Sequence, residues 1–357
     1  MRRPVTPLWL ARPSRVAGLS QPAARMLLAA LALFLMALMI PQATGGDTDT
    51  GYFASLVDGV RHGGAYYAVA ADTLRASGYT ARPFTTVALP TLTVIAAGLP
   101  VLALMAMLYA LAAAVAAAWH IRFRAALAPR APVWVASILL LLALLPAIRP
   151  DRLFVPDTWA GLLIALSLGL RRPDRWIEPV CFGLAAALIR DIAVLYMLVM
   201  AVFAWGEHCR RETLGWVAGL GIAIIAIAAH AHAVAEVVKP LDAPAAPLAP
   251  HGPGLFVASL SASALPGWIP HLLAALVIGI GLFGWAAWRS ETASRSLALF
   301  GVAALLIATI GGPDTLHWGQ LITPLLLPGL VFAVDGLRDL FGTALDTRRI
   351  TVRRIVR

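Results

Sequence analysis

The feature that most constrains this chain is a series of long apolar runs that contain no charged residue. Residues 26–40 and 132–148 are two of them. Each is roughly long enough to cross the ~30 Å of hydrocarbon in a bilayer as a helix. Only 13% of the 357 residues are charged and 60% are hydrophobic, whereas a soluble domain carries about 25% charged residues. The sequence therefore predicts a protein whose apolar side chains face lipid.

The apolar runs predict helices. A segment in lipid must satisfy its own backbone hydrogen bonds, which leaves helices or a closed β-barrel. These runs are rich in Ala and Leu and do not alternate polar and apolar residues as barrel strands do. We expect an all-α, polytopic transmembrane bundle of about ten spans. The predicted spans cover residues 26–41, 90–118, 132–148, 157–170, 177–189, 191–205, 214–232, 268–288, 297–310 and 318–335. The second is too long for one straight helix and could begin as a separate segment before Pro100.

Basic residues predict the orientation of these spans. When the N-terminus is placed inside, most of the 28 basic residues fall in cytoplasmic segments, as the positive-inside rule requires. Both termini are then cytoplasmic, and the expected location is a bacterial inner (plasma) membrane. The predicted organisation is a basic segment 1–25, a transmembrane domain 26–335 with periplasmic loops 42–89 and 233–267, and a basic tail 336–357.

Residues 177–205 allow two interpretations. One long helix would hold Arg190 and Asp191 at mid-membrane, at a cost of roughly 2.5 to 3.5 kcal/mol for each charge. It would also reverse every later span and move the basic tail outside. We therefore predict a helical hairpin with Arg190 and Asp191 at its outward tip.

The two long outward loops differ in character. Residues 51–60 and 66–77 have helical apolar spacing, so the first loop is expected to contain short helices along the membrane surface. The second loop, 233–267, is rich in Pro and Ala, and this composition predicts an extended segment.

Several classes of site are excluded. The net charge of +10 is scattered between apolar spans, so no nucleic-acid surface is expected. Cys181 and Cys209 support neither a disulfide framework nor a metal site. His230 and His232 are two residues apart, and on a helix such side chains point away from each other. No metal site is therefore predicted from these residues.

One membrane face gathers many ionisable side chains in this topology. Asp47 and Asp49 lie immediately beyond the first span. A carboxylate there could deprotonate an acceptor hydroxyl or help to hold a divalent cation, and Asp49 could instead cap a following helix. Loop residues are also polar simply because loops contact water. The outward set is Asp47, Asp49, Asp58, Arg61, His62, Asp72, Arg82, Asp151, Arg152, Asp157, Arg190, Asp191, His251, Asp314 and His317.

Short motifs in this arrangement resemble the membrane glycosyltransferases of the GT-C superfamily. The resemblance covers most of the chain as an order of spans, beginning with a carboxylate in the first outward loop. The other matching motifs are Gly64-Ala65-Tyr66-Tyr67, Arg82-Pro83-Phe84, Asp157-Thr158-Trp159, Arg190-Asp191 and Trp318-Gly319-Gln320.

The resemblance implies an activity and a division of roles. Such enzymes transfer a sugar from a polyprenyl-phosphate donor to an acceptor on the outer face. Asp47 or Asp49 would be the general base, and the sequence does not distinguish between the two. Arginine can grip phosphate oxygens through two hydrogen bonds, and the donor phosphate would bind Arg82, Arg152, Arg190 and His317. These four side chains could instead pair with nearby Asp151, Asp191 or Asp314, or with lipid head groups.

The expected function is that of a hexosyltransferase whose partners are a lipid-linked sugar donor and membrane lipids. The chain is short for such an enzyme, which leaves a glycan, lipid or protein acceptor open. A transporter or flippase of lipid-linked sugars is the alternative, and it requires ionisable residues inside the membrane. A non-catalytic membrane subunit of envelope glycan assembly is a third interpretation.

Overall fold

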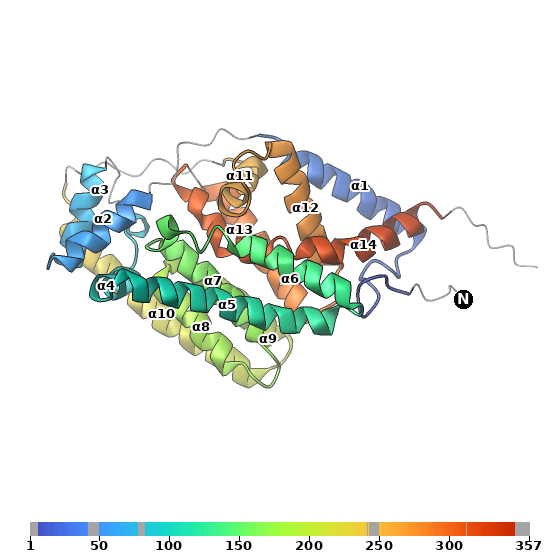
Figure 1. The fold of residues 1–357 in the computed structure, drawn as a ribbon, viewed down its shortest axis with the longest axis horizontal. Coiled ribbons are helices and arrows are strands. Elements are labelled where there is room, and N and C mark those ends of the chain that lie inside the picture. Colours follow the sequence, from blue (N-terminus) through green and yellow to red (C-terminus); the bar gives the residue numbers. More distant parts are fainter. Residues whose placement is uncertain are drawn as a thin grey trace, which may run out of the picture.

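The structure is a computed structural model that describes residues 6–41, 50–77, 83–240, 242, 250–311 and 313–346. These residues form helices and connecting turns, with two isolated β-bridges and no strand (Figure 1). The α-helices are α1 Gln21–Leu38, α2 Thr50–Arg61, α3 Tyr66–Ala76, α4 Pro90–Gly98, α5 Val101–Ala126, α6 Arg130–Leu144, α7 Pro156–Leu170, α8 Ile177–Ile189, α9 Val194–Gly206, α10 Arg210–Val237, α11 Pro253–Ala264, α12 His271–Ala287, α13 Glu291–Ile310 and α14 Gly329–Ala344. The short 3₁₀ helices are η1 Phe84–Thr86, η2 Pro150–Arg152, η3 Asp191–Ala193, η4 Pro313–Leu321 and η5 Thr323–Leu325.

Four helices, α1, α5, α10 and α13, are long and apolar enough to cross a membrane. They expose large apolar side chains, including Leu33, Leu102 and Ile225. Exposed aliphatic surface of this extent is typical of contact with lipid and unfavourable in water. The chain is therefore a helical membrane protein, which confirms the predicted all-α class.

Helix α7 lies at the centre of the bundle. Residues 156–169 are all buried, and α5, α8 and η4 pack around them (Figure 1). A helix of 15 residues spans roughly 22 Å. The two ends of α7 therefore lie well apart in the bundle.

Helices α8 and α9 form the predicted hairpin. α8 ends at Ile189, and α9 begins at Val194 after one turn of 3₁₀ helix. Arg190 in the turn contacts Asp157 at the start of α7, whereas Glu207 after α9 contacts Arg171 at the end of α7. The chain thus returns along α7, and the alternative of a single long helix is excluded.

Two helices also form in the loop 42–89, as predicted. α2 packs on α3 and α4, and α3 packs on α10. A small apolar cluster that includes Leu56, Tyr66, Val87 and Val234 joins α2, α3 and α10. This cluster fixes the pair of helices over one end of the bundle (Figure 1).

Two sequence predictions are corrected. The extended loop predicted over 233–267 instead contains α11, whose Phe256 and Leu260 are buried in the core. Pro253 fits the first turn of a helix because its missing N–H needs no partner there. The last predicted span, 318–335, is divided: η4 and η5 come first and α14 begins at Gly329. Pro324 and Pro328 lie in this stretch, and each removes a backbone donor that an α-helix requires.

Candidate functional site

Three elements bring Asp157, Arg190 and His317 together at one end of the bundle. Asp157 lies in the first turn of α7, Arg190 in the turn after α8, and His317 in η4. Arg190 Nε donates a hydrogen bond to Asp157 Oδ1 at 3.0 Å, and Arg190 Nη2 lies 3.3 Å from His317 Nε2. His317 Nε2 lies 3.7 Å from Asp157 Oδ2. We call these three side chains the ionic triad.

Close packing of η4 against α7 positions His317. Gly161 lies one turn after Asp157, and a Cβ atom there would overlap the carbonyl oxygen of Gln320. The Thr158 hydroxyl also donates to Gln320 Oε1 at 2.6 Å. From the other side, the backbone N–H of Gly319 donates to Ser259 Oγ in α11 at 2.9 Å. α7 and α11 together therefore hold η4 in place beside Arg190.

The ionic triad is buried, and its charges compensate each other. The Asp157 side chain is fully buried and that of Arg190 is 9% exposed. Burial lowers the pKa of Arg190, but attraction to Asp157 and Asp191 outweighs burial, so the pKa lies above its ordinary value. Arg190 therefore stays charged. Asp157 Oδ2 accepts no hydrogen bond from the residues that the structure describes. The His317 imidazole lies 3.7 Å from it and, when protonated, has an N–H to donate.

Two tyrosines from the surface helices face this region. Tyr52 of α2 and Tyr66 of α3 both lie within electrostatic range of Arg190. The Tyr52 hydroxyl is buried without a hydrogen-bond partner among the described residues. Burial raises the pKa of Tyr52 to about 12, so the phenol is neutral and can donate a hydrogen bond. The Tyr66 hydroxyl instead donates to the carbonyl oxygen of Ala88. Of these two tyrosines, only Tyr52 has a hydroxyl without a partner among the described residues.

The predicted phosphate-binding residues meet only in part. Arg190 and His317 are brought together. Arg152 instead contacts Asp151 at 3.6 Å in the loop before α7. Asp47, Asp49 and Arg82 lie outside the described residues.

Sequence reasoning assigned no role to Asp157, which appeared among the outward charges and in the motif Asp157-Thr158-Trp159. Its signal was its position directly after Pro156, because Pro favours the first turn of a helix. Asp157 is therefore in the first turn of α7, and this end of the helix is buried.

An apolar cleft adjoins the ionic triad. It lies between α7, α9, α13 and η4, and its lining includes Ile192 and Trp318, which neighbour the triad along the chain. Leu306 and Ile307 of α13 form the facing wall. The volume of the cleft is about 30 Å³. The ionic triad and the apolar surface of the cleft therefore lie next to each other.

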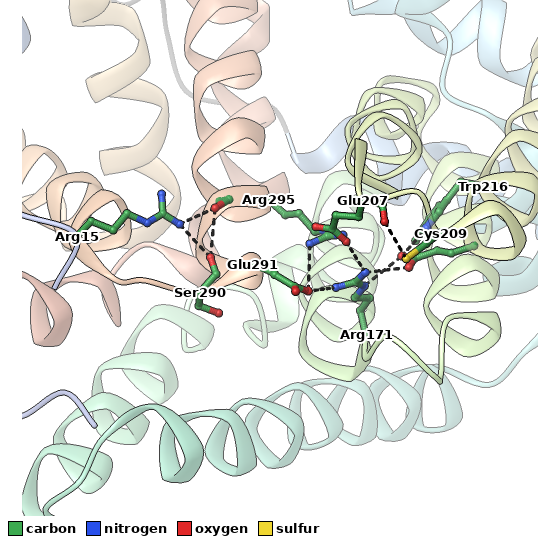
Figure 2. Close-up of polar contacts among 10 residues, drawn as sticks. Arg15, Arg171, Glu207, Cys209, Trp216, Ser290, Glu291 and Arg295 are labelled. Carbon is green, nitrogen blue, oxygen red and sulfur yellow. Dashed lines mark hydrogen bonds and ion pairs between the residues drawn. The ribbon is translucent and has the colours of Figure 1, made fainter. Parts of the chain in front are cut away.

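A second ionic cluster, which we call the Arg171 cluster, closes the other end of α7 (Figure 2). Arg171 binds both carboxylate oxygens of Glu212, at 3.1 and 2.8 Å. It also contacts Glu291 at 2.6 Å and Glu207 at 2.9 Å. Arg295 donates to the same Glu207 oxygen at 2.6 Å. This cluster joins the ends of α7 and α9 to the starts of α10 and α13.

The histidines of α10 lie apart, as predicted from their spacing. His230 is buried and contacts Tyr67 and the carbonyl of Val87, whereas His232 is exposed beside Glu236. Among the described residues, no group of three or more His, Cys, Asp or Glu side chains has the arrangement of a metal site.

The fold and its exposed apolar surface define the class: an all-helical membrane protein with a buried ionic site at one end. No protein-family model, no curated protein and no solved structure matches the chain.

Proposed function

We propose that the protein is a membrane glycosyltransferase that moves a sugar from a polyprenyl-phosphate donor to an acceptor on the outer face of a bacterial inner membrane. In this proposal the bundle has about ten spans, both termini are cytoplasmic, and the ionic triad faces outward. The arrangement is GT-C-like.

The observation that carries the proposal is the contact of Arg190 with His317 beside an apolar cleft. A polyprenyl-phosphate sugar has an anionic phosphate attached to a long apolar chain. Its recognition therefore requires hydrogen-bond donors next to an apolar surface at the edge of the membrane. Arg190 and His317 provide the donors, and the cleft lined by Ile192 and Trp318 provides the surface.

The chemistry assigns one task to each group. The bond between sugar C1 and the phosphate oxygen breaks, and a bond forms between C1 and the acceptor oxygen. The acceptor proton passes to the carboxylate of Asp47 or Asp49. Polyprenyl phosphate leaves, and Arg190 and His317 stabilise the charge that develops on it. Asp157 is a positioning residue because it holds the guanidinium of Arg190.

The orientation of Arg190 leaves part of the guanidinium for a ligand. Nε is engaged by Asp157, while Nη1 has only a long contact of 3.8 Å with Asp191. Phosphate oxygens favour arginine nitrogens at about 2.8 Å. A donor phosphate would therefore compete with Asp191 for Nη1 of Arg190, and the contact of Nε with Asp157 would remain.

Replacement of the predicted base tests the proposal. Asp47→Ala and Asp49→Ala, combined in one variant, should lower glycosyl transfer by about 10²- to 10⁴-fold, the usual contribution of a general base. The assay measures release of polyprenyl phosphate from a radiolabelled polyprenyl-phosphate sugar in membranes, together with the cell-envelope glycan of the strain. Full retention of both in the double variant would refute the proposal.

Asp58→Ala is the matched control. Asp58 is an exposed carboxylate of α2, 69% exposed, in the same loop. Its loss should leave transfer unchanged. An equal decrease of glycosyl transfer in Asp58→Ala and in the double variant would show that transfer depends only on the negative charge of the loop.

One observation favours a second function, that of a flippase for lipid-linked sugars. Buried ion pairs close both ends of α7, through Asp157 at one end and Arg171 at the other. A transporter that alternates between two open states needs a closure at each end. Movement of a fluorescent lipid-linked sugar across reconstituted vesicles, without glycosyl transfer, would support this alternative.

A further inference from the structure

A basic pocket lies at the opposite end of α7 from the ionic triad. Arg12, Arg122 and Arg289 line a cavity of about 210 Å³, and no acidic side chain is among its lining residues. Arg122 Nε donates to the carbonyl of Gly169 at 2.8 Å, which places the pocket beside the last turn of α7. We call this cavity the arginine pocket.

Backbone contacts build the arginine pocket. The N–H of Ala11 donates to the carbonyl of Ala126 at 2.8 Å, and the N–H of Arg15 donates to the carbonyl of Ala287 at 2.8 Å. The segment before α1 thus crosses the ends of α5 and α12. Asp335 of α14 accepts the backbone N–H groups of residues 8, 9 and 10 at 2.6 to 2.8 Å. The pocket is therefore a defined part of the fold.

The charged groups around the pocket are mainly basic: Arg171, Arg172 and Arg295 act on Arg122, and among the described charges that act on it Glu291 is the one carboxylate. Arg15 lies close by, and its pKa is lowered by burial and by the charge of Arg289. Ser290 is followed by Glu291, but Figure 2 shows the Glu291 carboxylate at Arg171 and Arg295, away from Arg15. Arg122 Nη2 is buried and has no hydrogen-bond acceptor among the described residues. A buried guanidinium N–H without an acceptor is unfavourable and favours an anionic ligand.

The surroundings of the pocket are those of a membrane interface. Trp288 lies in its wall, and tryptophan is enriched at the level of lipid head groups. Ile121, next to Arg122 in α5, is 54% exposed and can contact an acyl chain. Basic pockets between membrane helices are known to bind anionic head groups.

We propose that the arginine pocket binds the phosphate of an anionic phospholipid from the surrounding leaflet. The guanidinium groups of Arg12, Arg122 and Arg289 receive the phosphate oxygens, and the acyl chains lie along the apolar surface of α5. Such a lipid would join the N-terminal segment to α5 and α12. This site is independent of the glycosyltransferase proposal because it lies at the other end of the bundle.

Lipid binding to the purified protein tests this inference. Native mass spectrometry and thermal unfolding in detergent are measured with added phosphatidylglycerol, phosphatidylcholine or inorganic phosphate. Phosphatidylglycerol should bind and raise the unfolding temperature, and phosphatidylcholine should do neither. Arg12→Gln and Arg289→Gln together should weaken phosphatidylglycerol binding about tenfold or more, since each arginine near an anionic head group contributes appreciably to binding.

The double variant is chosen because both arginines are exposed, so their loss should not impair folding. Arg130→Gln with Arg175→Gln is the matched control, because these are exposed arginines outside the pocket. Equal weakening in the control would mean general charge attraction and would overturn the inference. Unchanged binding in the Arg12 and Arg289 variant, or equal stabilisation by inorganic phosphate alone, would overturn it as well.

Discussion

Arg190 Nε donates a hydrogen bond to Asp157 Oδ1 at 3.0 Å, and this ion pair joins the hairpin turn after α8 to the first turn of α7. The pair is buried, so each charge depends on the other. It also directs the remaining guanidinium nitrogens toward His317 and Asp191. The geometry of the candidate site therefore depends on this one contact.

A double-mutant cycle on Asp157 and Arg190 should reveal strong coupling. Asp157→Ala or Arg190→Ala alone should lower the free energy of unfolding by about 3 to 5 kcal/mol, because each leaves one buried charge unpaired. The double variant should lose less free energy of unfolding than the two single variants lose together. Unfolding is measured by denaturant titration in detergent. The exposed pair of Arg149 and Asp151 is the control, with an expected coupling of about 0 to 1 kcal/mol. Equal coupling in both pairs would contradict the account.

Substitution of Gly161 should disturb the site through packing. In Gly161→Ala the added methyl group overlaps the carbonyl oxygen of Gln320, so η4 must move away from α7 and carry His317 with it. Overpacking of this kind costs about 1 to 3 kcal/mol. Gly221→Ala is the control because nothing lies within 4 Å of a Cβ atom there. We expect lower thermal stability and lower transfer in Gly161→Ala only. Wild-type behaviour of Gly161→Ala would show that η4 does not need this close approach.

The Arg171 cluster should make stability depend on acidic pH. Burial raises the pKa of Glu207, but the hydrogen bond and charge of Arg295, together with Arg171, lower it by more, so its pKa is below the ordinary value. The stability that Glu207 contributes is therefore fully present above its unfolded pKa of about 4.3 and is lost as the pH falls through the lower folded pKa.

Thermal unfolding as a function of pH measures this contribution. Glu207→Gln should lower the unfolding temperature at neutral pH and flatten its decrease on acidification. Glu178→Gln, at an exposed position in α8, should retain the wild-type profile. A wild-type profile in Glu207→Gln would contradict the assigned role.

Asp335 should hold the N-terminal segment to the bundle. Its two carboxylate oxygens accept three backbone N–H groups, from residues 8, 9 and 10. Asp335→Asn replaces one acceptor oxygen by a donor, so at least one N–H loses its partner. Hydrogen bonds to charged groups contribute about 1.5 to 3 kcal/mol each. We expect faster cleavage by trypsin after Arg15 in limited proteolysis. Asp174→Asn, at an exposed turn residue, is the control. Equal rates of cleavage in Asp335→Asn and Asp174→Asn would count against the contact of Asp335 with the N-terminal segment.

Apolar periodicity and charge placement predicted the all-helical class, the hairpin with Arg190 at its turn, and the helices α2 and α3. They failed at α11 because its Pro-rich flank resembles a loop, while tertiary burial of Phe256 stabilises a helix there. They also missed the Arg171 cluster. Glu207, Glu212 and Glu291 come from three separate segments, and only the return of α9 along α7 brings two of them to Arg171.

The central claim is that the ionic triad faces the outside of the cell, because donor and acceptor binding depend on it. Labelling of intact cells with a membrane-impermeant maleimide tests it directly, on a background of Cys181→Ala and Cys209→Ser. His62→Cys is an exposed position in the turn after α2, at the end that carries the triad, and Arg172→Cys is an exposed position at the other end of α7. We expect His62→Cys to react in intact cells and Arg172→Cys to react only after the membrane is disrupted. Reaction of Arg172→Cys in intact cells, with His62→Cys protected, would contradict the claim.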